Sequence, residues 1–198
     1  MEITLVGRSN VGKSSVIRQL TGKKVLIGKR PGVTRRITRY KAGEMEIVDM
    51  PGFGFMSGIS KAAQDRIKTE IVNYIEINHG NIMLAMQVID VRSFSDIVRR
   101  WESRGQIPVD VEIFSLLKEL SLDPILIANK MDLIYPEERD AVLDDICGKL
   151  CLSPPWRQWI DVVVPISAKT GEGVPELKRL IRQKIHALGK GRLLGWLK

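Results

Sequence analysis

Residues 7–14 read Gly-Arg-Ser-Asn-Val-Gly-Lys-Ser, which is the spacing of a phosphate-binding loop. An apolar run at residues 3–6 precedes this loop and a helix-like stretch at residues 14–20 follows it, as the motif requires. Backbone N–H groups of such a loop surround phosphate oxygens, and the N-terminus of the following helix adds a favourable dipole. The loop therefore predicts a ligand that carries phosphate groups. Its predicted contacts are Gly7, Arg8, Ser9, Asn10, Val11, Gly12, Lys13, Ser14 and Ser15, with Lys13 on the outer phosphates and Ser14 on Mg²⁺.

The stretch Asn129-Lys130-Met131-Asp132 indicates the base of the nucleotide. It follows an apolar, strand-like run at residues 124–128. The carboxylate of Asp132 can accept hydrogen bonds from N1–H and N2–H₂ of guanine, whereas adenine has neither donor and would leave a buried carboxylate unpaired. Asn129 can contact the base edge and connect two loops, and the stem of Lys130 can pack along the base. Downstream of a phosphate-binding loop, this pattern predicts a guanine nucleotide rather than ATP.

A second motif, Ser167-Ala168-Lys169, supports this assignment because it follows the apolar strand expected at residues 162–166. The backbone N–H of Ala168 can donate to guanine O6. All three residues are therefore expected to line the guanine site. An Asn-Lys-x-Asp tetrapeptide alone would be weak support, because surface loops often contain such residues, but its position after a strand gives it weight.

The stretch Asp49-Met50-Pro51-Gly52 completes the phosphate end of the expected site. It ends an alternating, strand-like run at residues 44–48. Asp49 is placed to hold Mg²⁺ through a water molecule, and the N–H of Gly52 can contact the γ-phosphate. All four residues are therefore predicted to line the nucleotide.

The stretch Pro31-Gly32-Val33-Thr34 lies between the first expected helix and the strand that follows it. Thr34 is the candidate that closes over Mg²⁺ when the γ-phosphate is present. Thr38 is the alternative, but it falls where an alternating strand has already begun. The stretch is therefore predicted to contact the nucleotide. The expected Mg²⁺ ligands are Ser14, Thr34 and Asp49.

Three motifs resemble those of the EngB (YihA) family of ribosome-assembly GTPases, namely residues 7–15, 31–34 and 49–55. Proteins of this family are P-loop GTPases similar to TrmE, Era, EngA and septins. The resemblance covers nearly the whole chain and implies hydrolysis of GTP to GDP and phosphate with Mg²⁺. It also implies a switch role in assembly of the large ribosomal subunit and a role in normal cell division and septation. The chain departs from the family pattern by starting directly at the first strand and by an unfamiliar stretch at residues 92–108.

Position 53, directly after the Asp-x-x-Gly motif, is Phe where Ras-like enzymes have a Gln that orients the attacking water. Because Phe53 can neither donate nor accept a hydrogen bond, slow intrinsic hydrolysis is expected. Relatives with an apolar residue here and an Asn in the phosphate loop often use K⁺, and Asn10 matches that Asn, so the resemblance implies a K⁺ role for its carbonyl oxygen. The alternative is that Asn10 only suits the turn. The expected catalytic residues are Lys13, Asn10, Thr34 and Gly52.

Composition and periodicity favour a single α/β unit, a P-loop NTPase G domain. The 198 residues are 44% apolar and 27% charged, which is ordinary for a soluble globular protein with one core. Strands are expected at residues 3–6, 36–41, 44–49, 83–90, 124–129 and 161–166, and helices at 13–21, 60–78, 110–121, 137–150 and 174–188. This order predicts a six-stranded, mostly parallel sheet flanked by about five helices, with a hairpin at Gly43. A single GTP-binding domain is expected at residues 1–188, followed by a basic tail at 189–198 that could be disordered, dock on the domain or touch a membrane.

The net charge of +8 is concentrated at the two ends of the chain. Residues 3–43 contain eleven Lys and Arg and residues 177–198 contain seven, and neither segment contains an acid. Basic surfaces of this kind suit an RNA backbone, so ribosomal RNA and the large ribosomal subunit are predicted partners. The alternative is a solvated surface without a specific partner. The cations around Thr34 are Lys23, Lys24, Lys29, Arg30, Arg35, Arg36, Arg39 and Lys41.

The remaining features favour a cytoplasmic monomer. No apolar run approaches the roughly 20 residues of a membrane span, and no room for a signal peptide precedes the first strand. The two cysteines, Cys147 and Cys151, are expected to be reduced. Two alternatives to an assembly GTPase stay open, namely a GTP-binding scaffold with negligible turnover and a membrane-associated GTPase. In the unfamiliar stretch, Arg99, Arg100 and Arg104 either touch RNA or are solvated.

Overall fold

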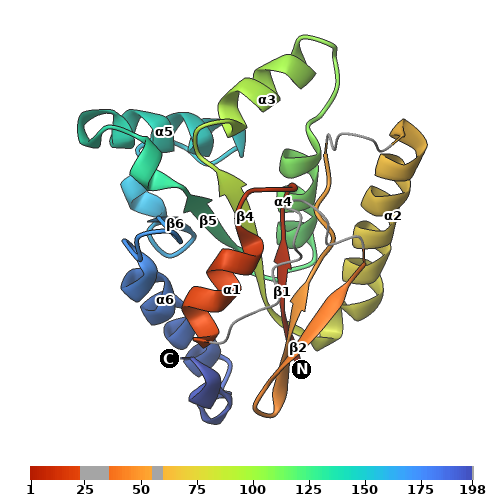
Figure 1. The fold of residues 1–198 in the computed structure, drawn as a ribbon, viewed down its shortest axis with the longest axis vertical. Helices are drawn as coiled ribbons and strands as arrows, with labels where there is room; N and C mark the ends of the chain where they lie inside the picture. Colours follow the sequence, from red (N-terminus) through yellow and green to blue (C-terminus); the bar gives the residue numbers. More distant parts are fainter. Residues whose placement is uncertain (23–35, 55–59, 198) are drawn as a thin grey trace.

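The computed structural model describes residues 1–22, 36–54 and 60–197, which form a central sheet between two layers of helices (Figure 1). The six strands lie in the order β2-β3-β1-β4-β5-β6. β2 is antiparallel to β3, and the other neighbouring pairs are parallel. The strands are β1 (Glu2–Val6), β2 (Thr38–Ala42), β3 (Met45–Asp49), β4 (Ile82–Asp90), β5 (Ile125–Asn129) and β6 (Val163–Ile166). The predicted six-stranded, mostly parallel sheet is therefore confirmed, including its one hairpin.

Helices cover both faces of this sheet. Side chains of β5 alternate between the two faces, so that Ile125 and Ile127 pack on the side of α1 and α6, whereas Leu126 and Ala128 pack on the side of α3, α4 and α5. α2 lies on this second side as well. Within the described residues, no helix has the length and apolar character needed to cross a membrane. The helices are α1 (Lys13–Thr21), α2 (Lys61–Asn78), α3 (Phe94–Glu102), α4 (Val109–Glu119), α5 (Arg139–Lys149) and α6 (Val174–Ala187).

Besides four shorter 3₁₀ helices, two elements of the described chain were not expected from the sequence, although both bounds of each predicted strand and helix lie within two residues of the observed ones. The first is α3, which lies within the unfamiliar stretch and beyond the carboxyl end of β4 (Figure 1). Its Phe94 and Val98 are buried in the same cluster as Leu143 of α5. The second is the 3₁₀ helix η5 (Gly191–Trp196). The tail therefore packs on the core, because Leu193 and Trp196 are buried in the cluster that contains α6.

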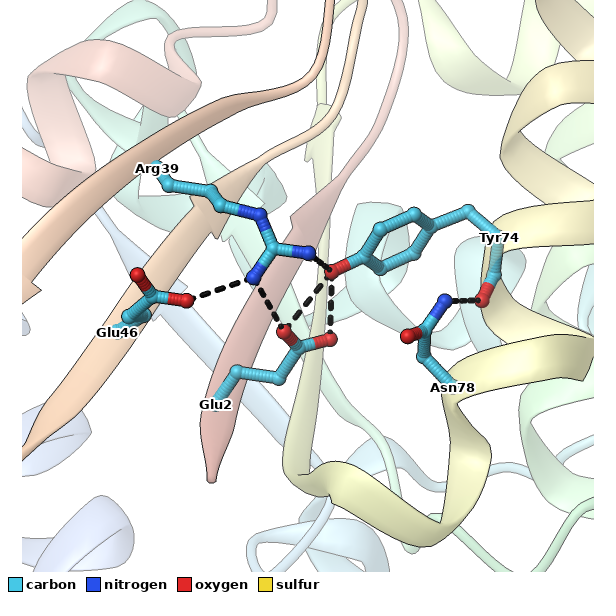
Figure 2. Close-up of polar contacts among 5 residues, drawn as sticks. All are labelled: Glu2, Arg39, Glu46, Tyr74 and Asn78. Atoms are coloured by element: carbon cyan, nitrogen blue, oxygen red, sulfur yellow. Dashed lines mark hydrogen bonds and ion pairs between the residues drawn. The ribbon is translucent and has the colours of Figure 1, made fainter.

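A buried glutamate at the start of β1 joins four elements (Figure 2). Glu2 is only 3% exposed, and both of its carboxylate oxygens accept from the hydroxyl of Tyr74 on α2 at 2.8 Å. Arg39 of β2 donates through Nη1 to Glu2 at 3.2 Å and to Glu46 of β3 at 2.6 Å. Its Nη2 donates to the Tyr74 hydroxyl at 2.8 Å. Arg39, which is predicted to belong to a basic partner surface, is thus paired with two carboxylates of the fold, although its side chain is 45% exposed.

The hydroxyl of Tyr74 gives this network a measurable pH dependence. Burial and the hydrogen bond to Glu2 raise the pKa of Tyr74 above its usual value of 10.0. The folded state holds the hydroxyl proton of Tyr74 more tightly than the unfolded state does. The hydroxyl therefore makes its full contribution to the free energy of unfolding below about pH 10, and this contribution is lost as the pH rises further. We expect Tyr74→Phe to lower the free energy of unfolding by about 1 kcal/mol at pH 8. In urea titrations at pH 11, the difference in free energy of unfolding between the unaltered protein and Tyr74→Phe should be smaller by roughly 1 kcal/mol. This value allows for the partial exposure of the ring.

The matched control is Tyr135→Phe, because this ring is 71% exposed. Its effect on the free energy of unfolding should be small and equal at both pH values. If the free energy of unfolding of Tyr74→Phe differed from that of the unaltered protein by the same amount at pH 8 and at pH 11, the network would not raise the pKa of the Tyr74 hydroxyl.

Candidate functional site

The loops that follow five strands meet at one edge of the sheet. β1, β3, β4, β5 and β6 run parallel, so their carboxyl ends share the upper edge in Figure 1. This edge carries the phosphate loop after β1, residues 50–53 after β3, residues 129–132 at the end of β5 and residues 167–169 after β6. Residues 31–34, and with them Thr34, lie outside the described part of the chain. The other predicted site residues are all brought to this edge.

The phosphate loop packs so closely on its neighbours that two positions require glycine. Gly12 precedes α1 with a φ of 103°, and a Cβ there would lie 2.3 Å from Nδ2 of Asn129. Gly7 has a φ of 155°, and a Cβ there would lie 2.3 Å from the carbonyl oxygen of Val88 in β4. Larger residues would therefore push the loop away from the sheet edge.

Lys13, in the first turn of α1, reaches back over the loop. Its Nζ donates to the carbonyl oxygens of Gly7 at 2.8 Å and Arg8 at 3.1 Å. The side chain is 7% exposed, and burial lowers the pKa of Lys13 to about 8, although the carboxylates of Asp49 and Asp110 raise it. A buried ammonium in this position is stabilised by an anion that enters the loop, because the anion replaces the lost hydration.

Asp49, at the end of β3, contacts the first turn of α1. Its Oδ2 accepts from the Ser14 hydroxyl at 3.4 Å, whereas its buried Oδ1 has no hydrogen-bond partner within the described residues. Burial raises the pKa of Asp49, and the Lys13 charge and the Ser14 hydrogen bond oppose this. An unpaired carboxylate oxygen beside a hydroxyl fits the oxygen ligands that Mg²⁺ prefers. No cluster of three or more His, Cys, Asp or Glu in the described segments could hold a metal alone, so Mg²⁺ here would also need water or phosphate oxygens.

Asn129 connects the phosphate loop with the loop after β6. It is 2% exposed, and its Nδ2 donates to the carbonyl oxygen of Val11 at 2.7 Å. Its Oδ1 accepts from the backbone N–H of Ala168 at 2.9 Å. The predicted connection between two loops is thus present. The same Ala168 N–H was expected to reach guanine O6, which would require this hydrogen bond to be shared.

Asp132 is held by side chains on both sides. Its Oδ1 accepts from the Ser167 hydroxyl at 2.7 Å, and its Oδ2 lies 3.8 Å from Nζ of Lys169. The Asp132 side chain is 15% exposed. Lys130 adopts the left-handed conformation, and its Nζ donates to Asp90 at 2.7 Å. This end of the site therefore presents a fixed, largely buried carboxylate.

The side chain of Arg8 is directed away from the loop interior, which differs from its predicted role as a phosphate contact. Its Nε donates to Asp110 of α4 at 2.5 Å, and its guanidinium lies 5.6 Å from the centre of the Phe53 ring. Asp110 is 1% exposed, and its carbonyl oxygen accepts from Gln87 of β4 at 2.8 Å. Asp110 could not be predicted from a local motif, because this pair joins residues 102 positions apart.

Three other predicted contacts can face a ligand only with their backbone. The side chains of Val11, Met50 and Met131 are buried in hydrophobic clusters, with exposures of 4%, 0% and 2%. Asn10 is exposed and has a φ of 66°, so its side chain is open to solvent at the mouth of the loop. Phe53 is 1% exposed, and its carbonyl oxygen accepts from the N–H of Ser9 at 3.0 Å.

Comparison with known proteins places this site in a family. The model of the family described as 50S ribosome-binding GTPase matches residues 2–130. The chain is 47% identical over 197 residues to the probable GTP-binding protein EngB of Methanosarcina mazei, covering 100% of this chain and 94% of that protein. It is 50% identical over 191 residues to the protein of the same name from Methanopyrus kandleri, covering 95% and 94%.

A solved structure agrees with these relatives. The crystal structure of a probable GTP-binding protein EngB superposes with a TM-score of 0.84 at 45% identity, covering 94% of this chain and 100% of that one. The residues that the family model matches include the phosphate loop and Asn129. With such identity over nearly its whole length, the chain belongs to the EngB family of P-loop GTPases.

Proposed function

We propose that this protein binds GTP with Mg²⁺, hydrolyses it to GDP and phosphate, and acts as a switch in assembly of the large ribosomal subunit. The nucleotide part is carried by Asn129, whose two hydrogen bonds unite the phosphate loop with the loop after β6. A ligand that fills both ends must carry phosphates and also a base with donors for Asp132. Guanine nucleotides meet both requirements.

The phosphate end follows from the buried charges. Lys13 would exchange its two carbonyl partners for phosphate oxygens, and Ser14 and Asp49 would hold Mg²⁺ together with Thr34. Mg²⁺, when bound, would neutralise charge on the phosphates. The N–H of Gly52 would contact the γ-phosphate, at a point where the backbone is so close to Ser9 that a Cβ would lie 2.8 Å from its Cα. The remaining proposed contacts are Gly7, Arg8, Asn10, Val11, Gly12, Ser15, Pro31, Gly32, Val33, Met50 and Pro51, of which Arg8, Val11 and Met50 would contribute only their backbone.

At the base end, Asp132 would accept from N1–H and N2–H₂ of guanine. The hydroxyl of Ser167 fixes the carboxylate in place before the base arrives, which reduces the entropy lost on binding. The stem of Lys130 would cover one face of the base, with its ammonium held by Asp90. Asn129, Met131, Ala168 and Lys169 would complete this end of the site.

Hydrolysis is expected to be slow without assistance. Phe53 occupies the position of a water-orienting glutamine, but its ring is buried and has no polar group. This observation also favours the second candidate function, a GTP-binding scaffold with negligible turnover. Hydrolysis would be faster with K⁺ bound at Asn10. The exposed side-chain carbonyl of Asn10 would hold K⁺ beside the phosphates, where negative charge develops in the transition state.

The proposed partner is ribosomal RNA in the large subunit. Support comes from the family description, from the excess of Lys and Arg at both ends of the chain, and from the relatives named EngB. The family resemblance also implies a role in normal cell division and septation, and we propose that the protein acts in the cytoplasm as a monomer.

Base recognition can be tested with Asp132→Asn. An amide at this position cannot accept both guanine donors, whereas it can pair with the additional oxygen of xanthine. GTP affinity should fall at least about 100-fold while affinity for xanthosine triphosphate rises. Titration of fluorescent guanosine and xanthosine nucleotides measures both. Asp161→Asn, at an exposed position, should leave both affinities unchanged. An unaltered preference in Asp132→Asn would reject the assignment.

The K⁺ role can be tested by phosphate release in 100 mM KCl and in 100 mM NaCl. We expect the rate in KCl to be about tenfold higher or more, because a K⁺ ion held by Asn10 would stabilise the negative charge that develops on the phosphates in the transition state. Asn10→Ala should retain GTP binding and lose the difference between the two salts. Equal rates for the unaltered protein in both salts would contradict the role of Asn10.

The assembly role can be tested by co-sedimentation with large ribosomal subunits in a non-hydrolysable GTP analogue, in GDP and without nucleotide. A switch should sediment with the subunits mainly in the GTP analogue, because the differential affinity of its two states sets its population on the subunit. Equal sedimentation in all three conditions would argue for a scaffold, and none in any condition would argue against the ribosomal role.

A further inference from the structure

A cleft of about 690 Å³ opens on the outer side of the phosphate loop. One wall consists of loop residues 8–11 together with Phe53 and Gly54. The other walls come from the first turns of α2, from α3 and from the start of α4. Figure 1 shows α3 beyond the carboxyl edge of the sheet, whereas α2 and α4 run alongside the strands. The unexpected helix α3 therefore helps to build a cavity directly beside the nucleotide site.

Positive charge dominates this cleft. Six of its lining residues are Lys or Arg and two are Asp. Three of the cations have acidic partners: Arg8 pairs with Asp110 at 2.5 Å, Lys68 with Glu112 at 2.6 Å and Lys130 with Asp90 at 2.7 Å. The other three form no ion pair within the described residues and are exposed, namely Arg92, Arg100 and Arg104. An anionic ligand would therefore meet guanidinium groups whose charge the fold does not balance.

The packing of α3 decides which arginines in this helix and in the turn that follows it, where Arg104 lies, line the cleft. Phe94 and Val98 anchor the helix against α5, and this fixes its rotation. Arg100 and Arg104 are four residues apart and both line the cleft, with Nε of Arg100 held by the carbonyl oxygen of Asp96 at 3.1 Å. Arg99, the neighbour of Arg100, instead donates to the carboxylate of Asp96 at 2.5 Å and does not line the cleft. Adjacent arginines thus have different surroundings.

Trp101 gives the cleft an apolar surface between these charges. Its ring lines the cavity and is partly buried against the cluster formed by α2 and α4. A guanidinium fork matches phosphate oxygens with two parallel hydrogen bonds, and an indole face can pack on a ribose or a base. Alternation of phosphate groups with flat apolar groups is a property of a nucleic-acid strand and not of an acidic peptide.

We propose that this cleft binds the sugar–phosphate backbone of RNA through Arg100 and Arg104. The proposal rests on the proposed function, because it takes ribosomal RNA as the partner and names its contact site. RNA in this position lies against Phe53 and Gly54, which follow the γ-phosphate contact at Gly52. Since binding free energies at coupled sites are reciprocal, RNA in the cleft and GTP in the loop are expected to affect each other's affinity.

The test measures binding of a fluorescein-labelled, single-stranded 20-nucleotide RNA of mixed sequence by anisotropy. The protein is used as the full chain with a non-hydrolysable GTP analogue, between 50 and 250 mM KCl. Removal of two phosphate contacts should weaken binding of the double variant R100A/R104A about tenfold or more at 100 mM KCl. It should also reduce the slope of log affinity against log salt by about 1.4, at about 0.7 per contact.

The control is Arg99→Ala, which removes one positive charge from α3 next to Arg100, whereas R100A/R104A removes two. Arg99→Ala should change RNA affinity less than about twofold. Binding of a fluorescent GTP analogue by all variants verifies that the nucleotide site is folded. Equal RNA affinity for R99A and R100A/R104A would overturn the proposal, as would absence of RNA binding by the unaltered protein. A labelled 20-residue polyglutamate that bound as tightly as RNA, with the same dependence on these arginines, would overturn it in favour of an acidic protein.

Co-sedimentation separates this proposal from the proposed function. If the unaltered protein sediments with large subunits and R100A/R104A sediments equally, the cleft assignment fails and the assembly role stands. If RNA binding depends on Arg100 and Arg104 but the unaltered protein does not sediment with subunits, the cleft assignment holds and the assembly role fails.

Discussion

The buried side-chain amide of Asn129 fixes the relative positions of the loops that form the nucleotide site. Its nitrogen donates to the phosphate loop and its oxygen accepts from the loop after β6. An amide at 2% exposure that lost either partner would cost about 1–3 kcal/mol, so both loops are held to the positions that satisfy it. The parallel strands bring the loop ends to the same edge, and this amide sets their spacing. A Cβ on Gly12 would lie in the space that the amide occupies.

Charge inside this frame is arranged around the place where phosphates would lie. In the described part of the chain, the ammonium of Lys13 donates only to carbonyl oxygens, and one oxygen of Asp49 has no hydrogen-bond partner. Burial lowers the pKa of Lys13 and raises the pKa of Asp49, which in both cases favours the uncharged form. A phosphate beside Lys13 and Mg²⁺ beside Asp49 would therefore compensate for the hydration that each charged group has lost. Arg8, by contrast, is already paired with Asp110, and this buried pair fastens the loop to α4 and Phe53. Its role is orientation of the loop, since breaking a buried pair costs far more than forming it gains.

The basic residues divide into those that hold the fold together and those that are available to a partner. Arg39 connects β2 to Glu2 and Glu46, and Lys68 connects α2 to α4. Arg100 and Arg104 have no such partner among the described residues and lie beside the phosphate loop. Net charge therefore identifies a class of partner, whereas the position of each cation identifies the surface that can bind it.

The sequence by itself determined the class of ligand and the positions of the strands and most helices along the chain, because both are encoded locally, whereas the order of the strands within the sheet came from the tertiary structure. The spacing of Gly7 to Ser14, the tetrapeptide at residues 129–132 and the alternation of apolar runs each depend on neighbours in the chain. The helix α3 was not predicted because its two buried residues, Phe94 and Val98, lie among charged residues in the sequence. Their burial depends on packing against α5, which is distant in the chain. The pairing of Arg8 with Asp110 and the placement of Arg39 on Glu2 were decided only by tertiary structure. These contacts join residues far apart in the chain, and a side chain's partner over such a separation is set by packing and burial rather than by local sequence.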